Sequence, residues 1–230
     1  MFSKRAMERI CGMLFLVVLV TVFVSGATDI YVSPERSEIG AVLERIANSQ
    51  GQYLTSLSLG ILGALLMIPL AGILYQVFST HGRSLALVAA FALVGTGLMS
   101  LTSLMLKFAL VSLSQDLAGT GSADAGLIVP IARALAFAND IIGFYAVITL
   151  LGMTMAALGI LLIQSRALPR WLGWLAAMGG VLMILDWLDL IGVAVLGMIG
   201  FLFFLLSLLV IGIWLVLRGT REAPAAQTLR

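Results

Sequence analysis

Five ionisable residues near the ends of long apolar segments are the groups of this chain that could do chemistry. They are Lys107, Arg133, Asp140, Asp186 and Asp189. Asp186 and Asp189 are three residues apart, so a helix would place both carboxylates on one face. Basic and acidic side chains gathered at one level could bind a small ligand or ion, relay protons, or join helix ends through ion pairs. These five residues form the predicted binding cluster.

Catalytic and cofactor motifs are absent from the sequence. His81 is the only histidine and Cys11 the only cysteine, which excludes bis-histidine haem ligation and a disulfide within one chain and argues against zinc sites. Neither a phosphate-binding Gly-Lys-Ser/Thr loop nor a Gly-x-Ser-x-Gly motif occurs. We therefore predict no catalytic residue, no cofactor and no metal. An intramembrane aspartyl site built on Asp140 and Asp186 or Asp189 is the alternative.

The elements that must position these residues are membrane-spanning helices. Of the 230 residues, 61% are hydrophobic and 10% are charged, whereas about 25% are charged in soluble domains. Mean hydropathy is +1.14. A span needs about 20 mainly apolar residues to cross a hydrocarbon core of about 30 Å. Six segments meet this requirement and predict a single all-α transmembrane bundle: 10–27, 54–78, 85–113, 141–163, 171–193 and 198–217.

Charge sorts onto two sides when the chain is cut at these spans. Nine basic residues fall on one side and four on the other, and short cytoplasmic loops carry the basic excess. We therefore predict a multi-pass protein of the inner (plasma) membrane, in contact with the lipid bilayer, with both termini cytoplasmic. The net charge of +2 gives nucleic-acid binding no support. The nine are Lys4, Arg5, Arg9, Arg83, Arg166, Arg170, Arg218, Arg221 and Arg230; the four are Arg36, Arg45, Lys107 and Arg133.

Depth along the spans places the binding cluster toward the outer surface. At about 1.5 Å per residue, all five of its residues reach the outer third of the membrane or the outer interface. Trp187 and Tyr53 fit an interfacial aromatic belt at that level. The sequence thus predicts an outward-facing polar cluster.

The segments between the spans carry further expectations. Residues 34–49 have the apolar stripe of an amphipathic helix lying at the outer interface. Residues 114–124 are polar and Gly-rich, which favours a flexible loop. Pro130 would open a helical approach, 131–139, that leads into span four.

Small residues predict where the spans pack, because Gly, Ala and Ser let backbones approach closely in a membrane. Pro69 predicts a kink in span two. The predicted faces are Ser56, Gly60 and Ala64 in span two, Gly152 and Ala156 in span four, and Gly173 with Ala177 and Ala176 with Gly180 in span five.

The first span has an alternative interpretation. Basic residues, an apolar core from Met13 to Val24 and then Ser25-Gly26-Ala27 are also typical of a secretory signal with a small-residue cleavage site. Cleavage there would leave five spans and an N-terminus on the outside. The length of the apolar run favours a retained span.

Three short segments carry a family resemblance. Leu74–Phe78, Gly82–Leu87 and Ser165–Gly173 resemble the cytoplasmic loops of a bacterial six-helix membrane family catalogued as the domain of unknown function four-three-eight-six. The resemblance covers about Met13 to Leu190. Where family members often have Pro-Val-Asn before the third span, this chain has residues 79–81 as Ser-Thr-His. The resemblance implies an integral membrane protein without an established activity.

The sequence as a whole favours a non-enzymatic bundle whose outer polar cluster binds a small ligand or a membrane partner. A small-molecule or ion transporter is the first alternative, with the cluster as a vestibule and Pro69 as a hinge. Against it, the spans show no clear internal repetition and the cytoplasmic half lacks ionisable residues for a through-path. An intramembrane enzyme is the second alternative.

Overall fold

The computed structural model describes residues 4–32, 39–120, 125–165, 169–187 and 195–220. Every element within these ranges is a helix, so the predicted all-α class is confirmed. The helices are α1 (Lys4–Val32), α2 (Ile39–Asn48), α3 (Gln50–Phe78), α4 (Arg83–Thr120), α5 (Ala125–Asp140), the π-helix η2 (Ile141–Ala146), α6 (Val147–Ser165), α7 (Arg170–Trp187) and α8 (Val195–Thr220).

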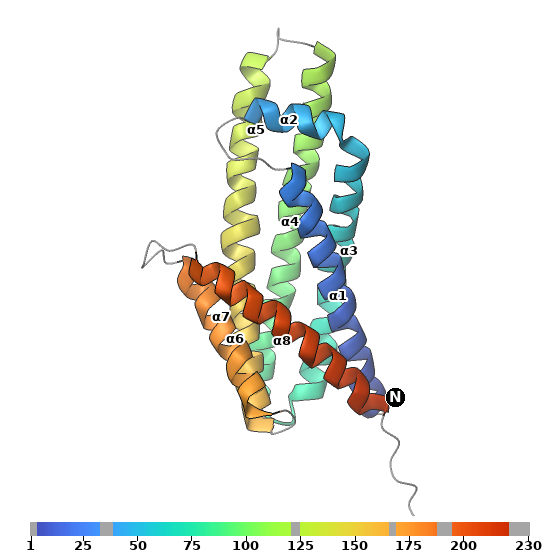
Figure 1. Cartoon of the computed structure of the whole chain (residues 1–230), viewed down its shortest axis with the longest axis vertical. Coiled ribbons are helices and arrows are strands. Elements are labelled where there is room, and N and C mark those ends of the chain that lie inside the picture. The colour runs from blue at the N-terminus through green and yellow to red at the C-terminus, as the bar shows by residue number, and fades with distance from the viewer. Residues whose placement is uncertain (1–3, 33–38, 121–124, 166–168, 188–194, 221–230) are drawn as a thin grey trace, which may run out of the picture.

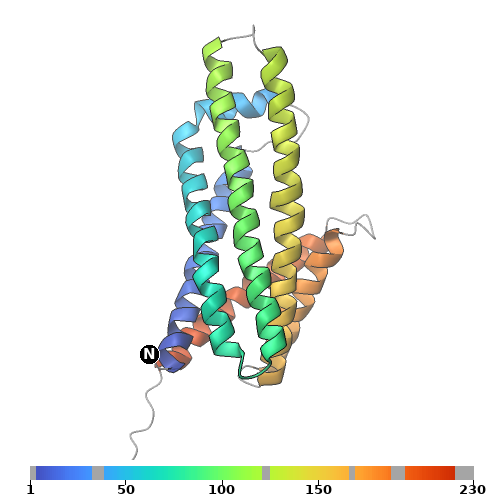
Figure 2. The ribbon, with the colours of Figure 1, turned by 180° about the vertical axis from the view of Figure 1, so that it is seen from behind.

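The longest helices run side by side along one axis (Figure 1). α1, α3, α4 and the continuous rod of α5, η2 and α6 form the bundle, α2 lies across α4 and α5 near one end, and α8 crosses the bundle obliquely. Seen from behind, α3, α4 and the α5–α6 rod are neighbours (Figure 2). The other end of the bundle holds the starts of α1, α4 and α7 and the ends of α3, α6 and α8. We call it the basic end, because Arg5, Arg83 and Arg170 lie at or next to the first residue of their helices there.

Five helical stretches are long and apolar enough to cross a membrane. They are Arg5–Ser25, Gln50–Phe78, Arg83–Gly119, Gly126–Ser165 and Ile199–Leu217. The predicted fifth span, 171–193, corresponds to α7, a shorter apolar helix of 18 residues, and residues 188–193 lie outside the described part of the chain. The helices therefore indicate a membrane protein.

Helices α6 and α7 approach so closely that their glycines leave no room for a side chain. A Cβ added at Gly152 would lie 2.7 Å from the carbonyl oxygen of Gly180. A Cβ at Gly159 would lie 2.6 Å from the carbonyl oxygen of Gly173 and would collide with the backbone nitrogen of Ala177. The packing faces predicted from the small residues of spans four and five are thus in contact, as backbone approach in a membrane requires.

The expected loop at 114–124 is wrong for its described part, because α4 continues as a helix to Thr120. The hydroxyl of Ser114 donates to the carbonyl oxygen of Val111 at 2.7 Å, and Ser114 is 1% exposed. Leu117 packs against the buried residues around it. The polar residues of this segment therefore belong to a packed helix and not to a loop. Pro130 lies inside α5 and does not open it, yet the predicted helical run into span four is present.

Buried side chains form two cores. The main core joins α1, α3, α4, α6, α7 and α8 and includes Cys11 and Phe15, both fully enclosed. The second core lies toward the end where α2 crosses, and α2 contributes Leu43 and Ile46 to it, while Glu44 is exposed. α2 is thus anchored by an apolar stripe over the described part of the predicted amphipathic segment.

Candidate functional site

A cavity of about 260 Å³ lies beneath α2, between that helix, α3, α4 and the junction of α5 with η2. α2 supplies an apolar wall of Ile39, Val42 and Ile46. The remaining lining residues are Tyr53, Lys107, Leu110, Arg133, Ala136, Phe137, Asn139, Asp140, Ile141 and Tyr145. We call this space the α2 cavity.

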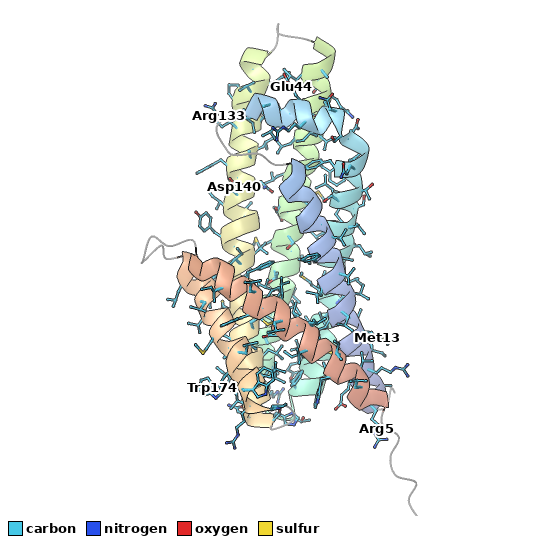
Figure 3. All side chains as sticks on the ribbon, in the orientation of Figure 1. Arg5, Met13, Glu44, Arg133, Asp140 and Trp174 are labelled. Atoms are coloured by element: carbon cyan, nitrogen blue, oxygen red, sulfur yellow. The ribbon has the colours of Figure 1, made fainter. Side chains whose placement is uncertain are left out.

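The α2 cavity brings together three residues of the predicted binding cluster. Lys107 comes from α4, while Arg133 and Asp140 come from α5 and are labelled in Figure 3. The same figure shows Arg5 at the opposite end of the molecule. The side chain of Asp186 and the whole of Asp189 lie outside the described residues, so their place in the cluster stays a prediction.

The π-helix η2 follows directly after Asp140 and sets the geometry of this wall. Short π-turns within α-helices occur frequently at functional sites. Ser103 of α4 donates a hydrogen bond of 2.7 Å to the side-chain oxygen of Asn139. A Cβ at Gly143 would lie 2.5 Å from the Ser103 hydroxyl. The absence of a side chain at Gly143 thus lets η2 approach α4 beside the cavity.

Tyr53 does not occupy the expected aromatic belt. It is 2% exposed, belongs to the second core and lines the α2 cavity. Asn139 and Tyr145 also line the cavity and were missed by sequence reasoning. Asn139 was detectable, because a second polar residue beside Asp140 stands at the start of a long apolar run. Tyr145 carried no such signal, since it lies within that run.

The α2 cavity lies where the exposed surface of the bundle changes from apolar to polar. On α3, exposed Thr55 and Ser58 are followed by exposed Leu62. On α4, which runs the opposite way, exposed Phe108 is followed by exposed Ser112. From Arg83 to Phe108, α4 covers about 37 Å at 1.5 Å per residue, which matches a hydrocarbon core of about 30 Å with its boundaries. Lys107 therefore stands at one edge of the apolar belt.

A second cavity, of about 90 Å³, lies deeper in the bundle. Its walls are mainly apolar and come from α1, α3, α4, α6 and α8, with Thr96 and Ser100 as its polar residues. The hydroxyl of Thr96 donates to the carbonyl oxygen of Ala92 in its own helix. The two cavities share no lining residue.

The chain belongs to the family described as Domain of unknown function (DUF4386), whose match covers residues 10–219. This membership confirms the resemblance carried by the short loop segments. No curated protein and no solved structure matches the chain.

Proposed function

We propose that this family member is a non-enzymatic protein of the inner membrane that spans the bilayer six times and binds a small ligand in the α2 cavity. The basic end faces the cytoplasm, so both termini lie there and the cavity opens outward. α7 is the fifth span, since its 18 residues reach about 27 Å. A retained first span fits the contribution of Phe15 to the main core.

The observation that carries this proposal is the convergence of charged residues in one cavity at the edge of the apolar belt. Lys107, Arg133 and Asp140 line it together with Tyr53 and apolar side chains. Binding sites typically combine an apolar lining with a few polar groups that fix orientation. Ionisable groups near membrane depth are costly and are functional candidates by default.

The transporter alternative needs a polar route from the α2 cavity toward the basic end. The deeper cavity of about 90 Å³ in the described bundle is mainly apolar and shares no lining residue with the α2 cavity. The enzyme alternative needs a second acid beside Asp140, and Asp140 is the only carboxylate among the described residues that line the cavity. The apolar lining of the deeper cavity argues against transport, and the single described carboxylate of the α2 cavity argues against catalysis, so we favour binding.

The test is which side of the membrane reaches the cavity. Ala136 lines it and is partly exposed, so Ala136→Cys introduces a small thiol there. Cys11 is fully buried, so we expect it not to react with a membrane-impermeant maleimide. Exposed positions at the two ends provide matched controls as Gln52→Cys and His81→Cys.

We expect Ala136→Cys and Gln52→Cys to react in sealed right-side-out vesicles, and His81→Cys to react in inside-out vesicles. Reaction of Ala136→Cys from the inside-out face would support a carrier and reject the proposal. If Gln52→Cys reacts while Ala136→Cys reacts from neither side, the cavity is closed to water and the proposal fails.

A further inference from the structure

The mouth of the α2 cavity is bordered by apolar side chains. Phe137 is 68% exposed, Ile141 45% and Tyr145 36%, and all three line the cavity. Leu127 and Ile131 continue the exposed apolar face along α5 at helical spacing. A water-soluble ligand would gain nothing from such a border, whereas an acyl chain would be covered by it.

A shallow depression on the surface of α5 adjoins this mouth. It is formed by Val129, Pro130, Arg133, Ala134 and Phe137, so Arg133 and Phe137 border both hollows. We call it the α5 depression. The depression extends from Arg133 toward the start of α5, away from the apolar belt, whereas Phe137, Ile141 and Tyr145 follow one another from the cavity toward the belt.

The size of the cavity limits what it encloses. Sites for whole drug-sized molecules measure about 300–1,000 Å³, and the α2 cavity measures about 260 Å³. It has room for a headgroup and not for a complete lipid. Because Lys107 stands at the edge of the apolar belt, a lipid whose headgroup entered the cavity would keep its chains at membrane depth.

The charges select the type of headgroup. The described lining holds two basic residues, Lys107 and Arg133, and one acid, Asp140. The guanidinium of Arg133 offers paired donors that match phosphate oxygens, and Lys107 adds a point charge that suits phosphate. One positive charge in excess favours a headgroup of net negative charge.

We propose that the α2 cavity binds the phosphate headgroup of an anionic lipid from the outer leaflet, with the acyl chains against Phe137, Ile141 and Tyr145. This inference rests on the proposed function, because it needs the cavity to open at the outer edge of the belt. It goes further by assigning the ligand class and its route of entry through the lipid.

The test compares thermal stability of the full chain in dodecylmaltoside micelles with four additives. Dioleoylphosphatidylglycerol is the anionic lipid, the corresponding phosphatidylcholine and phosphatidylethanolamine are zwitterionic lipids, and glycerol phosphate is the headgroup without chains. A ligand that binds only the folded state raises Tm in a saturable way. We expect phosphatidylglycerol alone to give a saturable rise.

Variants separate the cavity from general attraction of anionic lipid to basic surfaces. Arg133→Gln should weaken the apparent affinity about ten- to a hundredfold, as expected for lost hydrogen bonds to a charged group. Arg45→Gln is the matched control, because Arg45 is an exposed basic residue on α2 outside the cavity lining. It should keep the full response.

Each contrary result overturns the inference in a different way. An equal response to glycerol phosphate identifies a soluble anion as the ligand, and a larger response to phosphatidylethanolamine identifies a zwitterion. An equal response of Arg133→Gln and Arg45→Gln places the lipid elsewhere. Outward labelling of Ala136→Cys would stand in all three cases, so failure of the lipid assignment remains distinguishable from failure of the proposed function.

Discussion

Replacing Gly159 with alanine tests how closely α6 and α7 pack. The added Cβ would lie 2.6 Å from the carbonyl oxygen of Gly173 and 2.8 Å from the Cα of Ala177, and would collide with the backbone nitrogen of Ala177. All three neighbours are backbone atoms, so no side chain can rotate away. The helices must separate locally, and the other close contacts of the pair, such as Gly152 with Gly180, must loosen with them.

The expected size of the effect comes from a matched pair of variants. Forcing an extra carbon into a packed site costs about 1–3 kcal/mol, while Gly→Ala in a helix gains up to about 1 kcal/mol in propensity. Gly72→Ala isolates the gain in helix propensity, because no atom outside its own stretch of helix backbone lies within 4 Å of a Cβ added there. The free energies of unfolding of Gly72→Ala and Gly159→Ala should therefore differ by about 1–3 kcal/mol.

The assay is reversible unfolding of both variants in mixed micelles by titration with sodium dodecyl sulfate, followed by far-ultraviolet circular dichroism. Gly72→Ala should be at least as stable as the starting protein, and Gly159→Ala should be less stable than Gly72→Ala. Equal stability of the two variants would refute the close backbone approach of α6 and α7.

Three further predictions concern the polar contact beside the cavity, the main core and the second core. Ser103→Ala should lower the free energy of unfolding by about 0.6–1.7 kcal/mol, because it removes a hydrogen bond between two helices of the membrane region. Thr96→Val should have a smaller effect in the same titration, because the Thr96 hydroxyl donates to the carbonyl oxygen of Ala92 in its own helix. Cys11 should react with a small maleimide only after denaturation, since its side chain is 0% exposed; rapid labelling of the folded protein would contradict the burial. Leu43→Ala should cost about 2–5 kcal/mol and speed hydrogen exchange in α2, while exposed Glu44→Ala should leave exchange unchanged.

The convergence of Lys107, Arg133 and Asp140 on one cavity could be predicted from the sequence. Counting about 1.5 Å per residue along span three gives the level of Lys107, and Asp140 opens span four with Arg133 seven residues before it. Residues at one level on neighbouring helices are expected to lie close together. The level of each residue along its helix is thus contained in the sequence, while a binding role for the cluster stays a prediction.

The inward position of Tyr53 and the π-turn after Asp140 could not be predicted in this way. A tyrosine at the edge of a span fits an interfacial belt and a packed core equally well by composition. Tyr53 is buried in the second core together with side chains of α2, α4 and α5, and that packing is a tertiary arrangement. The π-turn of Ile141–Ala146 contains Gly143, which lies close to Ser103, and that is a contact between residues far apart in the chain.

The length of α4 links the fold to the cavity. Its 38 residues extend about 57 Å, nearly twice a hydrocarbon core of about 30 Å. The part beyond Phe108 must therefore leave the lipid, and its apolar face with Leu110 and Val111 must be covered by protein. α2 and α5 provide that cover, but α2 has only 10 residues and crosses the pair at an angle. The α2 cavity is the space that this short cover leaves open, so the cavity lies at the level where α4 leaves the apolar belt.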